Sequence, residues 1–516
     1  MRTRKSLLNF VTGLTGQMLA LAASLVQRMV FTRLMSASYL GLSGLFSGML
    51  ALLSLAELGV GPAITFSLYK PLAQGDTQTV KGLMRLFCRA YRVIGCVILA
   101  LGFLLTPVYP HLIRDPGTIP ELTLIYWLYV VNTGISYFFS YKISLITADQ
   151  NQYIRNIGHY AAYVLLNLAQ TVLLVLTRSY VLFLLCQIGF TLAENLLLSR
   201  AADRRYPYLR ERDARALTRE ERAPIVRNIK AMLCHNVGNM VVNSTDSILI
   251  ARILGLSVSG VYSNYALILT AVRNVLARVF DAVQAGVGNV YAQGDLPKLQ
   301  TLYERLFFLA FWLFGVCAIA LGCLIQPCVA LLFGEAYLLD NLTVATLVAS
   351  FYVTGMRSVL YVLRAAAGIY YRDWAKPLVE AAVNLAASIL FLRRFGTAGV
   401  FMGTLVSSLL GTGIEAHVTC RHVLGTRAEA FYRPYARYAL SAAVSGALVF
   451  AALRQVGGVG LGSLLLRSVL CVAMAGALFA AGSWKSPELA YFLNLIRRTA
   501  QGLKRRGFPP QHTDGQ

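Results

Sequence analysis

The sequence contains few charged residues for its length. Of its 516 residues, 14% are Asp, Glu, Lys or Arg, whereas 57% are hydrophobic, and the mean hydropathy is +0.60. Soluble domains carry about 25% charged residues, so the composition argues against a water-soluble globular protein. Apolar runs of about 18 residues or more recur along the whole chain, which predicts membrane-spanning helices.

Acidic residues are especially scarce. The sequence has 23 Asp and Glu against 47 Lys and Arg, which gives a formal net charge of +24. Such a charge can indicate nucleic-acid binding, but most of the basic residues stand at the ends of apolar runs. That placement follows the positive-inside rule of membrane proteins. We therefore expect no nucleic-acid partner.

Groups that carry enzyme chemistry are also sparse. Six histidines are scattered and nine cysteines occur singly, with no CxxC pair and no His partner at metal-ligand spacing. The sequence contains no HExxH, no G-x4-G-K-[ST] and no G-x-S-x-G, the signatures of zinc proteases, P-loop NTPases and α/β-hydrolases. We predict a transporter rather than an enzyme, with no catalytic residue, no metal site and no bound cofactor. Transport would then draw on a gradient, with H⁺ or Na⁺ as candidate coupling ions.

Fourteen apolar segments are long enough to cross a bilayer. The first begins with a basic stretch, MRTRK, that mimics a signal peptide, but its apolar run continues to about residue 34, so we expect an uncleaved first helix. The predicted fold class is an all-α integral membrane protein with about 14 transmembrane helices. The predicted spans cover residues 8–34, 39–69, 86–108, 119–145, 154–176, 179–199, 228–254, 257–289, 303–333, 341–366, 374–393, 397–420, 434–454 and 460–482.

The loop charges predict that both termini are cytoplasmic. Lys and Arg concentrate at the N-terminus, in even-numbered connections and in the C-terminal tail, and basic loops stay on the cytoplasmic side. Arg393 and Arg394, in an odd-numbered connection, go against this trend. The tail carries Leu489, Phe492 and Ile496 at helical spacing before a basic end. That pattern predicts either an interfacial helix on anionic lipid or a partly disordered basic tail.

An internal repeat divides the chain. FTRLMSASYLGL (31–42) aligns with IARILGLSVSGV (250–261) at an offset of 219, which pairs Gly41 with Gly260, and GVGPAI (59–64) matches GVGNVY (286–291) after eight inserted residues. Because six spans is an even number, the halves would form a parallel repeat of two pseudo-symmetric six-helix lobes with a substrate site between them. The predicted domains are an N-lobe (1–199), a basic cytoplasmic connection (200–227), a C-lobe (228–425), two further spans (426–484) and a basic cytoplasmic tail (485–516).

Polar residues recur at helical spacing on the first and seventh spans. The offset of 219 places Gln17 on Asn236 and Ser24 on Asn243. Polar side chains within a bilayer must face protein or water, because exposure to lipid is costly. We therefore predict that these four residues line a central cavity formed by both lobes and contact the substrate there.

Ten charged residues lie inside or near the ends of apolar spans, where each costs roughly 2.5–3.5 kcal/mol at the membrane centre. Arg28 and Arg273 have no acidic residue three or four positions away, and a guanidinium is well suited to holding a phosphate or pyrophosphate. Arg357 and Arg364 form a second basic face, and we predict that they also contact the substrate. The ten are Arg28, Glu57, Asp246, Arg273, Arg278, Asp281, Arg357, Arg364, Glu380 and Glu415.

Some of these charges have a structural interpretation. Arg278 and Asp281 are three residues apart and can neutralise each other, and Glu415 stands near a helix end where it can face water. Glu57 and Asp246 are candidates for ion coupling, since a buried carboxylate can exchange a proton or bind Na⁺ during a transport cycle. The alternative for each is a pair with an arginine on a neighbouring helix.

Several segments resemble Wzx-type oligosaccharide flippases, a family of the multidrug/oligosaccharidyl-lipid/polysaccharide (MOP) exporter superfamily. SLAELGVGPAITFSLYKPLAQGD (54–76) is similar to the second-helix signature of that family. The similarity continues through NSTDSILIARILGLSVSGVYSNY (243–265), GVGNVYAQGD (286–295), FYVTGMRSVLYVLRAAAGIYYRDWAKPLVEAAVNLAAS (351–388) and GTAGVFMGTLVSS (396–408). One departure is IEAHVTC (414–420), where Glu415 is followed by Ala rather than Pro.

The resemblance implies a MOP flippase fold and alternating access in the bacterial cytoplasmic membrane. The implied activity is flipping of undecaprenyl-pyrophosphate-linked oligosaccharide for cell-surface polysaccharide synthesis, with other polysaccharide-assembly membrane proteins as candidate partners. It also implies that arginines on the first and eighth spans, here Arg28 and Arg273, handle the pyrophosphate.

The second span contains a predicted joint. Gly59, Gly61 and Pro62 follow Glu57 and weaken the helix where a lobe must bend or pack closely, so we predict a hinge there. Two other functions remain open. One is an ion-coupled multidrug or metabolite antiporter of the same fold, which would favour an acidic cavity. The other is an integral-membrane polysaccharide polymerase or ligase, which would need a long extracytoplasmic loop.

Overall fold

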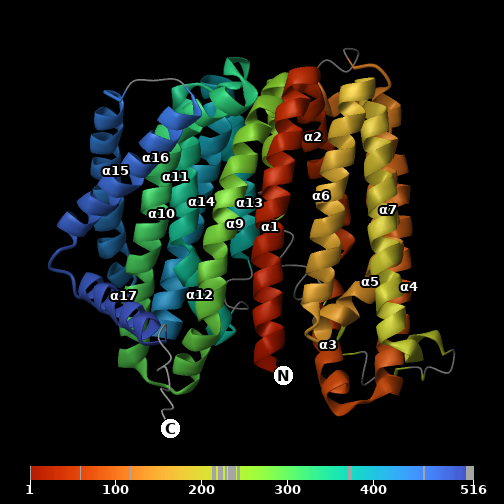
Figure 1. The fold of residues 1–516 in the computed structure, drawn as a ribbon, viewed down its shortest axis with the longest axis horizontal. Coiled ribbons are helices and arrows are strands. Elements are labelled where there is room, and N and C mark those ends of the chain that lie inside the picture. Colours follow the sequence, from red (N-terminus) through yellow and green to blue (C-terminus); the bar gives the residue numbers. More distant parts are fainter. Residues whose placement is uncertain are drawn as a thin grey trace, which may run out of the picture. The chain divides into compact units, whose positions relative to one another are not determined.

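The computed structural model describes residues 2–57, 60–114, 119–211, 244–369, 375–456 and 460–506, together with isolated positions among 215–240. This part of the chain is nearly all helical (Figure 1), which confirms the predicted fold class. The main helices are α1 (Arg2–Leu34), α2 (Ala37–Leu53), α3 (Val60–Gln74), α4 (Thr77–Leu104), α5 (Leu122–Ala148), α6 (Gln152–Thr177), α7 (Tyr180–Arg205), α9 (Leu256–Ala292), α10 (Leu296–Phe333), α11 (Asn341–Met356), α12 (Ser358–Ala367), α13 (Lys376–Phe395), α14 (Thr397–Thr419), α15 (Glu429–Leu453), α16 (Leu461–Gly482) and α17 (Pro487–Arg506).

Ten helices in the described residues are long and apolar enough to cross a membrane. The other four predicted spans differ from these for identifiable reasons. Span 39–69 is interrupted after α2, and span 228–254 lies partly outside the described residues, with 244–253 helical. The remaining two are α9 and α13, which are helical but carry several charges.

The chain forms two compact units, each assembled from separated segments. Unit 1 takes in residues 1–271, 332–343 and 374–411, and unit 2 takes in 272–331, 344–373 and 412–516. Helices α9 and α14 therefore contribute to both units. The lobe boundaries that the sequence suggests remain a prediction.

The second predicted span is broken rather than continuous. Helix α2 ends at Leu53, a 3-10 turn, η1 (Ser54–Glu57), follows, and α3 begins at Val60. Gly61 and Pro62 lie in the first turn of α3, whereas Gly59 falls outside the described residues. A β-carbon on Gly61 would lie 2.9 Å from the Tyr91 hydroxyl, so this glycine makes room for a close side-chain contact. Bending at this joint remains a prediction.

Two glycines lie at a close crossing of α2 and α9 within unit 1. A β-carbon on Gly41 would lie 1.8 Å from the carbonyl oxygen of Leu256, and one on Gly260 would lie 1.9 Å from that of Ala37. Ala37 and Gly41 become Leu256 and Gly260 at the offset of 219 found in the sequence. The contact is thus reciprocal, as at a two-fold interface, and it supports the internal repeat.

A local signal fixes the start of α4. Asp76 is the N-cap residue, and its carboxylate accepts bonds from the backbone N–H of Thr79 at 3.0 Å and from the Thr79 hydroxyl at 2.6 Å. These bonds satisfy an N–H group that the first turn of a helix leaves without a partner. They favour the ionised carboxylate, so the Thr79 hydroxyl, followed by the backbone N–H, lowers the pKa of Asp76.

Aromatic packing dominates the described part of unit 2. The ring of Phe311 on α10 stacks on Tyr438 of α15 at 4.5 Å and on Phe479 of α16 at 4.4 Å between centroids. All three side chains are buried. The two helices that follow the predicted C-lobe are therefore fixed to α10 by stacked rings, which contribute about 0.5–1.5 kcal/mol per pair beyond their burial.

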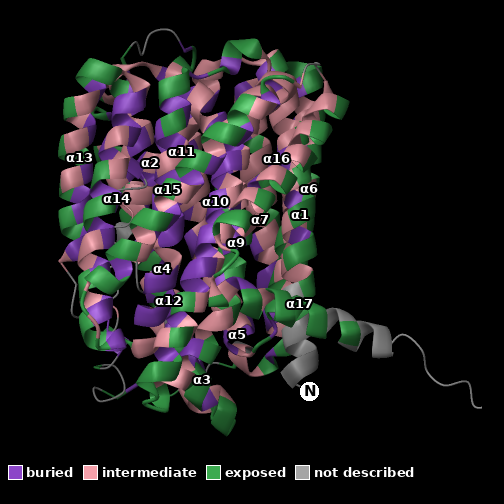
Figure 2. Ribbon diagram, turned by 90° about the vertical axis from the view of Figure 1, so that its left-hand side faces the viewer, coloured by how far each residue is buried: buried purple, intermediate pink, exposed green. Residues whose placement is uncertain are grey.

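The outward faces of several helices are apolar. Figure 2 shows half-buried and exposed residues along α1 and α6, and the exposed residues of α6 include Leu165, Leu168, Val172, Val175 and Leu176. Large apolar side chains on an exposed helix face are typical of contact with lipid. This surface agrees with a multi-pass membrane protein.

The C-terminal tail begins as an ordered helix rather than an irregular chain. Helix α17 is held to α10 by Arg305, whose guanidinium lies 3.8 Å from the ring centroid of Tyr491, and by Phe492, which stacks on Phe308. Leu493 and Ile496 are 45% and 64% exposed, and Arg497 and Arg498 are exposed beside them. An exposed apolar face with a basic end is the pattern of an interfacial helix.

Candidate functional site

Arg28 of α1 is held by neutral partners. Its Nε donates to the side-chain carbonyl oxygen of Asn264 at 2.9 Å, and its Nη2 donates to the hydroxyl of Ser263 at 2.7 Å. Both partners belong to α9, and Ser263 in turn donates to the carbonyl of Gly260. Among the described residues, no carboxylate lies within 4.0 Å of this guanidinium, so Arg28 is fixed in position while its positive charge remains uncompensated.

Of the four residues predicted to line the cavity, the structure describes Gln17 and Ser24. Ser24 is buried and donates to the carbonyl of Leu21 in its own helix, and Gln17 is half-buried on α1. Asn236 and Asn243, their predicted counterparts, lie outside the described residues. The proposed match of the two stripes therefore remains a prediction.

Asn9 and Gly13, near the start of α1, contact α6 and the turn before it. Asn9 accepts from the backbone N–H of Tyr153 at 2.7 Å and donates to the carbonyl of Gln150 at 3.1 Å, and a β-carbon on Gly13 would lie 3.3 Å from Asn156. This end of α1 therefore packs on α6. The physical reason is that the N-terminus of α6 has N–H groups to satisfy.

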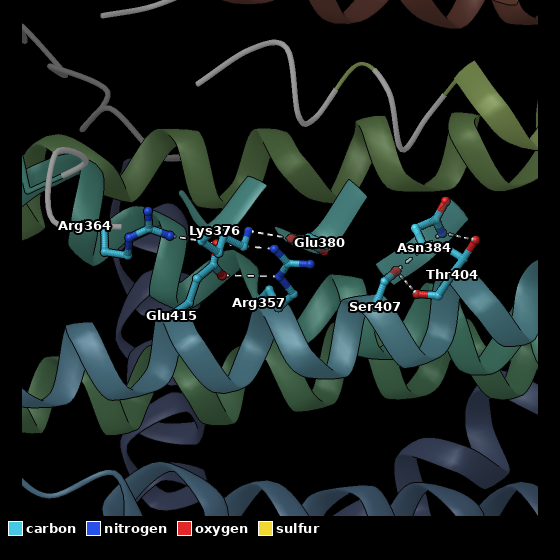
Figure 3. Close-up of polar contacts among 8 residues, drawn as sticks. All are labelled: Arg357, Arg364, Lys376, Glu380, Asn384, Thr404, Ser407 and Glu415. Carbon is cyan, nitrogen blue, oxygen red and sulfur yellow. Dashed lines mark hydrogen bonds and ion pairs between the residues drawn. The ribbon is translucent and has the colours of Figure 1, made fainter. Parts of the chain in front are cut away.

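Arg357 and Arg364 converge on a single carboxylate in unit 2. Glu415 accepts from Arg357 Nε at 3.2 Å and from Arg364 Nη1 at 2.7 Å (Figure 3). Arg364 and Glu415 are 2% and 5% exposed, so Glu415 does not face water as its place near a helix end suggested. The two arginines are thus part of an ion-pair cluster, which weakens the case that they contact the substrate.

Three further charges, Arg278, Asp281 and Glu380, are paired within their own helices. The i,i+3 pair of Arg278 and Asp281 is 3.9 Å apart, with both side chains mostly exposed. Glu380 pairs with Lys376 one turn earlier on α13 at 2.8 Å, with both side chains buried (Figure 3). Arg273 of α9 donates a long bond of 3.4 Å to the hydroxyl of Thr354. Its predicted pyrophosphate role remains a prediction.

Within the part of the chain that the structure describes, Glu57 is held by tyrosines and not by an arginine. The Tyr137 hydroxyl donates to Glu57 Oε2 at 2.6 Å, and the Tyr91 hydroxyl donates to Oε1 at 3.4 Å. The two phenols come from α4 and α5, so they fix the carboxylate without neutralising its charge. No short-range pattern in the sequence links these residues, because the partners lie 34 and 80 positions away.

A cavity of about 990 Å³ opens beside Glu57 within unit 1. Its walls come from η1 and helices α3 to α7. One wall carries a polar contact in which His159 Nδ1 lies 2.8 Å from Glu194 Oε1. The lining comprises Glu57, Ala63, Thr65, Phe66, Tyr69, Tyr91, Ser140, Ile143, Ser144, Thr147, Arg155, His159, Glu194, Asn195 and Leu198.

Asp246 lies in a buried polar cluster of unit 1. Its Oδ2 accepts from the hydroxyl of Thr404 at 3.5 Å, and Asn384 donates to Thr404 at 3.0 Å and to Ser407 at 3.4 Å; the last three residues are drawn in Figure 3. Asp246 Oδ1 and Asn384 Oδ1 are buried and have no hydrogen-bond partner among the described residues. Asn384, Thr404 and Ser407 were not singled out in the sequence, although an Asn in an apolar span is itself a signal.

These oxygens suit a small hard cation. An isolated buried carboxylate is unstable unless it is protonated or faces a positive charge, and carboxylate, amide and hydroxyl oxygens are the ligands that such cations prefer. The cluster thus fits one of the two candidate coupling ions, Na⁺. Protonation of Asp246 would meet the same physical requirement.

The fold matches solved membrane transporters. No protein-family model matches the chain, and no curated protein matches it in sequence. The lipid II flippase MurJ in an inward closed conformation aligns with a TM-score of 0.65 over 92% of this chain and 99% of that chain, at 11% identity. An inward-facing multidrug resistance MATE family transporter of the MOP superfamily aligns with a TM-score of 0.57 over 78% and 97%, at 17% identity.

A second MATE transporter, a mutant of VcmN from Vibrio cholerae, gives a TM-score of 0.58 over 80% of this chain and 96% of that chain, at 12% identity. The alignments cover almost the whole of each solved chain. At this level of identity they establish the fold alone, which the chain shares with MurJ and with MATE transporters.

Proposed function

We propose that the protein flips an undecaprenyl-pyrophosphate-linked oligosaccharide from the cytoplasmic to the outer leaflet of the bacterial cytoplasmic membrane, by alternating access between its two lobes. The fold is shared with a lipid II flippase over nearly the full length of both chains. The fold is also shared with multidrug transporters, so the choice of substrate depends on the charged groups of this chain.

The observation that carries the proposal is the setting of Arg28. Serine and asparagine side chains hold its guanidinium in place without cancelling the charge, which leaves it available to an anion. A guanidinium has five N–H donors in a planar fork that matches phosphate oxygens, and two of these donors serve the contacts with α9. An organic cation would be repelled by the same group.

Replacing Arg28 with alanine is expected to slow flipping of a fluorescent undecaprenyl-pyrophosphate oligosaccharide in proteoliposomes by about 10- to 100-fold. This is the effect expected from losing one hydrogen bond to a charged group. Arg28→Lys should recover part of the rate, because a charge without the planar fork remains. Arg33→Ala is the matched control, since Arg33 is exposed near the end of the same helix. If Arg28→Ala flips the substrate at the wild-type rate, Arg28 does not bind the pyrophosphate.

We further propose that Asp246, Asn384 and Thr404 hold the coupling ion, and that this ion is Na⁺. The support is the pair of buried oxygens on Asp246 and Asn384 that have no hydrogen-bond partner in the described part of the chain. Binding of Na⁺ to the folded protein alone would raise its thermal stability by mass action.

The expected result is a higher unfolding temperature for the wild type in NaCl than in KCl at equal ionic strength, and no such difference for Asp246→Asn. Asp281→Asn controls for the loss of a carboxylate, because Asp281 is mostly exposed. A wild type that is indifferent to Na⁺ but whose flipping follows an imposed pH gradient would assign the coupling to protons instead. A sodium effect that persists in Asp246→Asn would exclude this site.

The partners proposed for this function are anionic lipids and other polysaccharide-assembly membrane proteins. For the lipids, support comes from α17, whose exposed Leu493 and Ile496 adjoin Arg497 and Arg498. Such a face is attracted both to the acyl boundary and to anionic headgroups.

A further inference from the structure

The cavity beside Glu57 in unit 1 is lined by neither Arg28 nor Asp246. It lies near the end of the unit where α1 begins, because its lining includes Thr147 and Arg155, which flank the α5–α6 turn, and Asn9 of α1 contacts that turn. Arg28 lies twelve residues beyond Gly16 on α1, or about 18 Å along the helix, and Gly16 is the residue that packs on Tyr160 of α6. The cavity is therefore separate from the Arg28 site.

The lining chemistry is that of a site for polyhydroxyl groups. Four aliphatic hydroxyl side chains, Thr65, Ser140, Ser144 and Thr147, share the cavity with carboxylates, an imidazole and a guanidinium. A sugar presents hydroxyls that both donate and accept, so it pairs with carboxylate acceptors and with Arg or His donors at once. Hydrogen bonds to the charged members are the stronger ones.

The two carboxylates are held in place before any ligand arrives. Glu57 is fixed by the hydroxyls of Tyr91 and Tyr137, and Glu194 is fixed by His159. Each carboxylate can still accept further bonds, since its oxygens together have about four acceptor positions. Preorganised polar groups of this kind lower the ordering cost of binding.

Aromatic rings stand at the exposed side of the same cavity. Phe66 and Tyr69 are 67% and 49% exposed, and their rings meet edge to face at 6.1 Å between centroids. Exposed rings beside polar groups offer a flat apolar surface for the C–H face of a sugar ring. A volume of about 990 Å³ is at the upper end for ligand pockets and accommodates several sugar rings.

We propose that this cavity binds the glycan of the lipid-linked substrate, as a loading site for neutral sugar residues distinct from Arg28. The inference rests on the proposed function. The cavity favours a neutral glycan over an organic cation, because Arg155 lies on its wall together with the carboxylates. It also favours a neutral glycan over the pyrophosphate, because the two carboxylates would repel the negative charge of the pyrophosphate.

The test compares two substrates in proteoliposomes, undecaprenyl pyrophosphate carrying one N-acetylglucosamine and the same lipid carrying chitotetraose. In Glu194→Gln, the ratio of the tetrasaccharide rate to the monosaccharide rate should fall about tenfold, which is the effect of losing one charge-assisted hydrogen bond. Tyr69→Leu should also lower the ratio, because leucine keeps apolar contact but not the flat ring. Glu335→Gln, at an exposed position outside the cavity, should leave the ratio unchanged.

An unchanged ratio in both variants, or an equal fall for both substrates, would overturn the inference. Saturation-transfer NMR of free chitotetraose on the detergent-purified protein separates this inference from the proposed function. If the wild type binds the sugar, Tyr69→Leu does not, and neither lipid is flipped, the cavity assignment stands and the flipping proposal fails. Wild-type protein that binds a cationic dye in place of chitotetraose would assign the cavity to cations and contradict the inference.

Discussion

Gly41→Ala is expected to prevent accumulation of folded protein. The added β-carbon would lie 1.8 Å from the backbone carbonyl oxygen of Leu256, far inside van der Waals contact, and a backbone atom cannot move aside as a flexible side chain can. Alanine gains about 1 kcal/mol of helix propensity over glycine. A forced separation of α2 from α9 loses the packing along the whole crossing, so we expect a net loss above about 4 kcal/mol.

The repeat makes the same prediction for the partner glycine. Gly260→Ala would place its β-carbon 1.9 Å from the Ala37 carbonyl oxygen, so the two variants should be equally destabilised. The matched control is Gly189→Ala on α7, where nothing lies within 4 Å of the new β-carbon. Expression level, monodispersity in detergent and unfolding temperature provide the comparison. Folded Gly41→Ala with the stability of Gly189→Ala would show that the helices do not cross at this point.

Glu415→Ala is expected to lose about 3–5 kcal/mol of stability, the range seen when one member of a buried ion pair is removed. The carboxylate faces two guanidiniums at 3.2 and 2.7 Å with both partners largely shielded from water. Its removal leaves Arg357 and Arg364 close together in a region of low dielectric, where like charges repel strongly. Glu415→Gln should be nearly as damaging, because the amide keeps the shape but not the charge.

The matched comparison is Glu429→Gln on α15. Glu429 and Arg433 form an exposed i,i+4 pair at 3.6 Å, and such pairs contribute only about 0.3–0.5 kcal/mol. Unfolding temperatures of the two Gln variants in the same detergent measure the difference. Comparing the Arg357→Gln, Glu415→Gln double mutant with the two single mutants would measure the coupling energy between Arg357 and Glu415. Equal unfolding temperatures for Glu415→Gln and Glu429→Gln would refute the cluster.

The fold was largely accessible from the sequence because membrane helices satisfy their own backbone hydrogen bonds, and long apolar runs therefore define them. The repeat was also visible, since Gly41 and Gly260 stand at equivalent places in matching segments. The break between α2 and α3 was foreseen from Gly59, Gly61 and Pro62 as a weak point, but not as a 3-10 turn.

The site was less accessible because its contacts join residues far apart in the chain. Local spacing identified Arg28, Glu57 and Asp246 as unusual charges but could not supply their partners. The tyrosines on Glu57 and the oxygens around Asp246 come from helices that only tertiary packing brings together. The same limit explains Arg357 and Arg364, which local spacing presented as a basic face and which the structure pairs with Glu415.

Under the proposed function, the transported molecule is recognised by its pyrophosphate. The most direct measurement is transport by wild-type protein in proteoliposomes of one fluorescent oligosaccharide carried on undecaprenyl pyrophosphate and on a neutral lipid that lacks both phosphates, with a cationic dye as a third substrate. We expect rapid flipping of the pyrophosphate lipid and little movement of the neutral lipid or the dye. Export of the dye with no preference for the pyrophosphate lipid would contradict it and favour a multidrug antiporter.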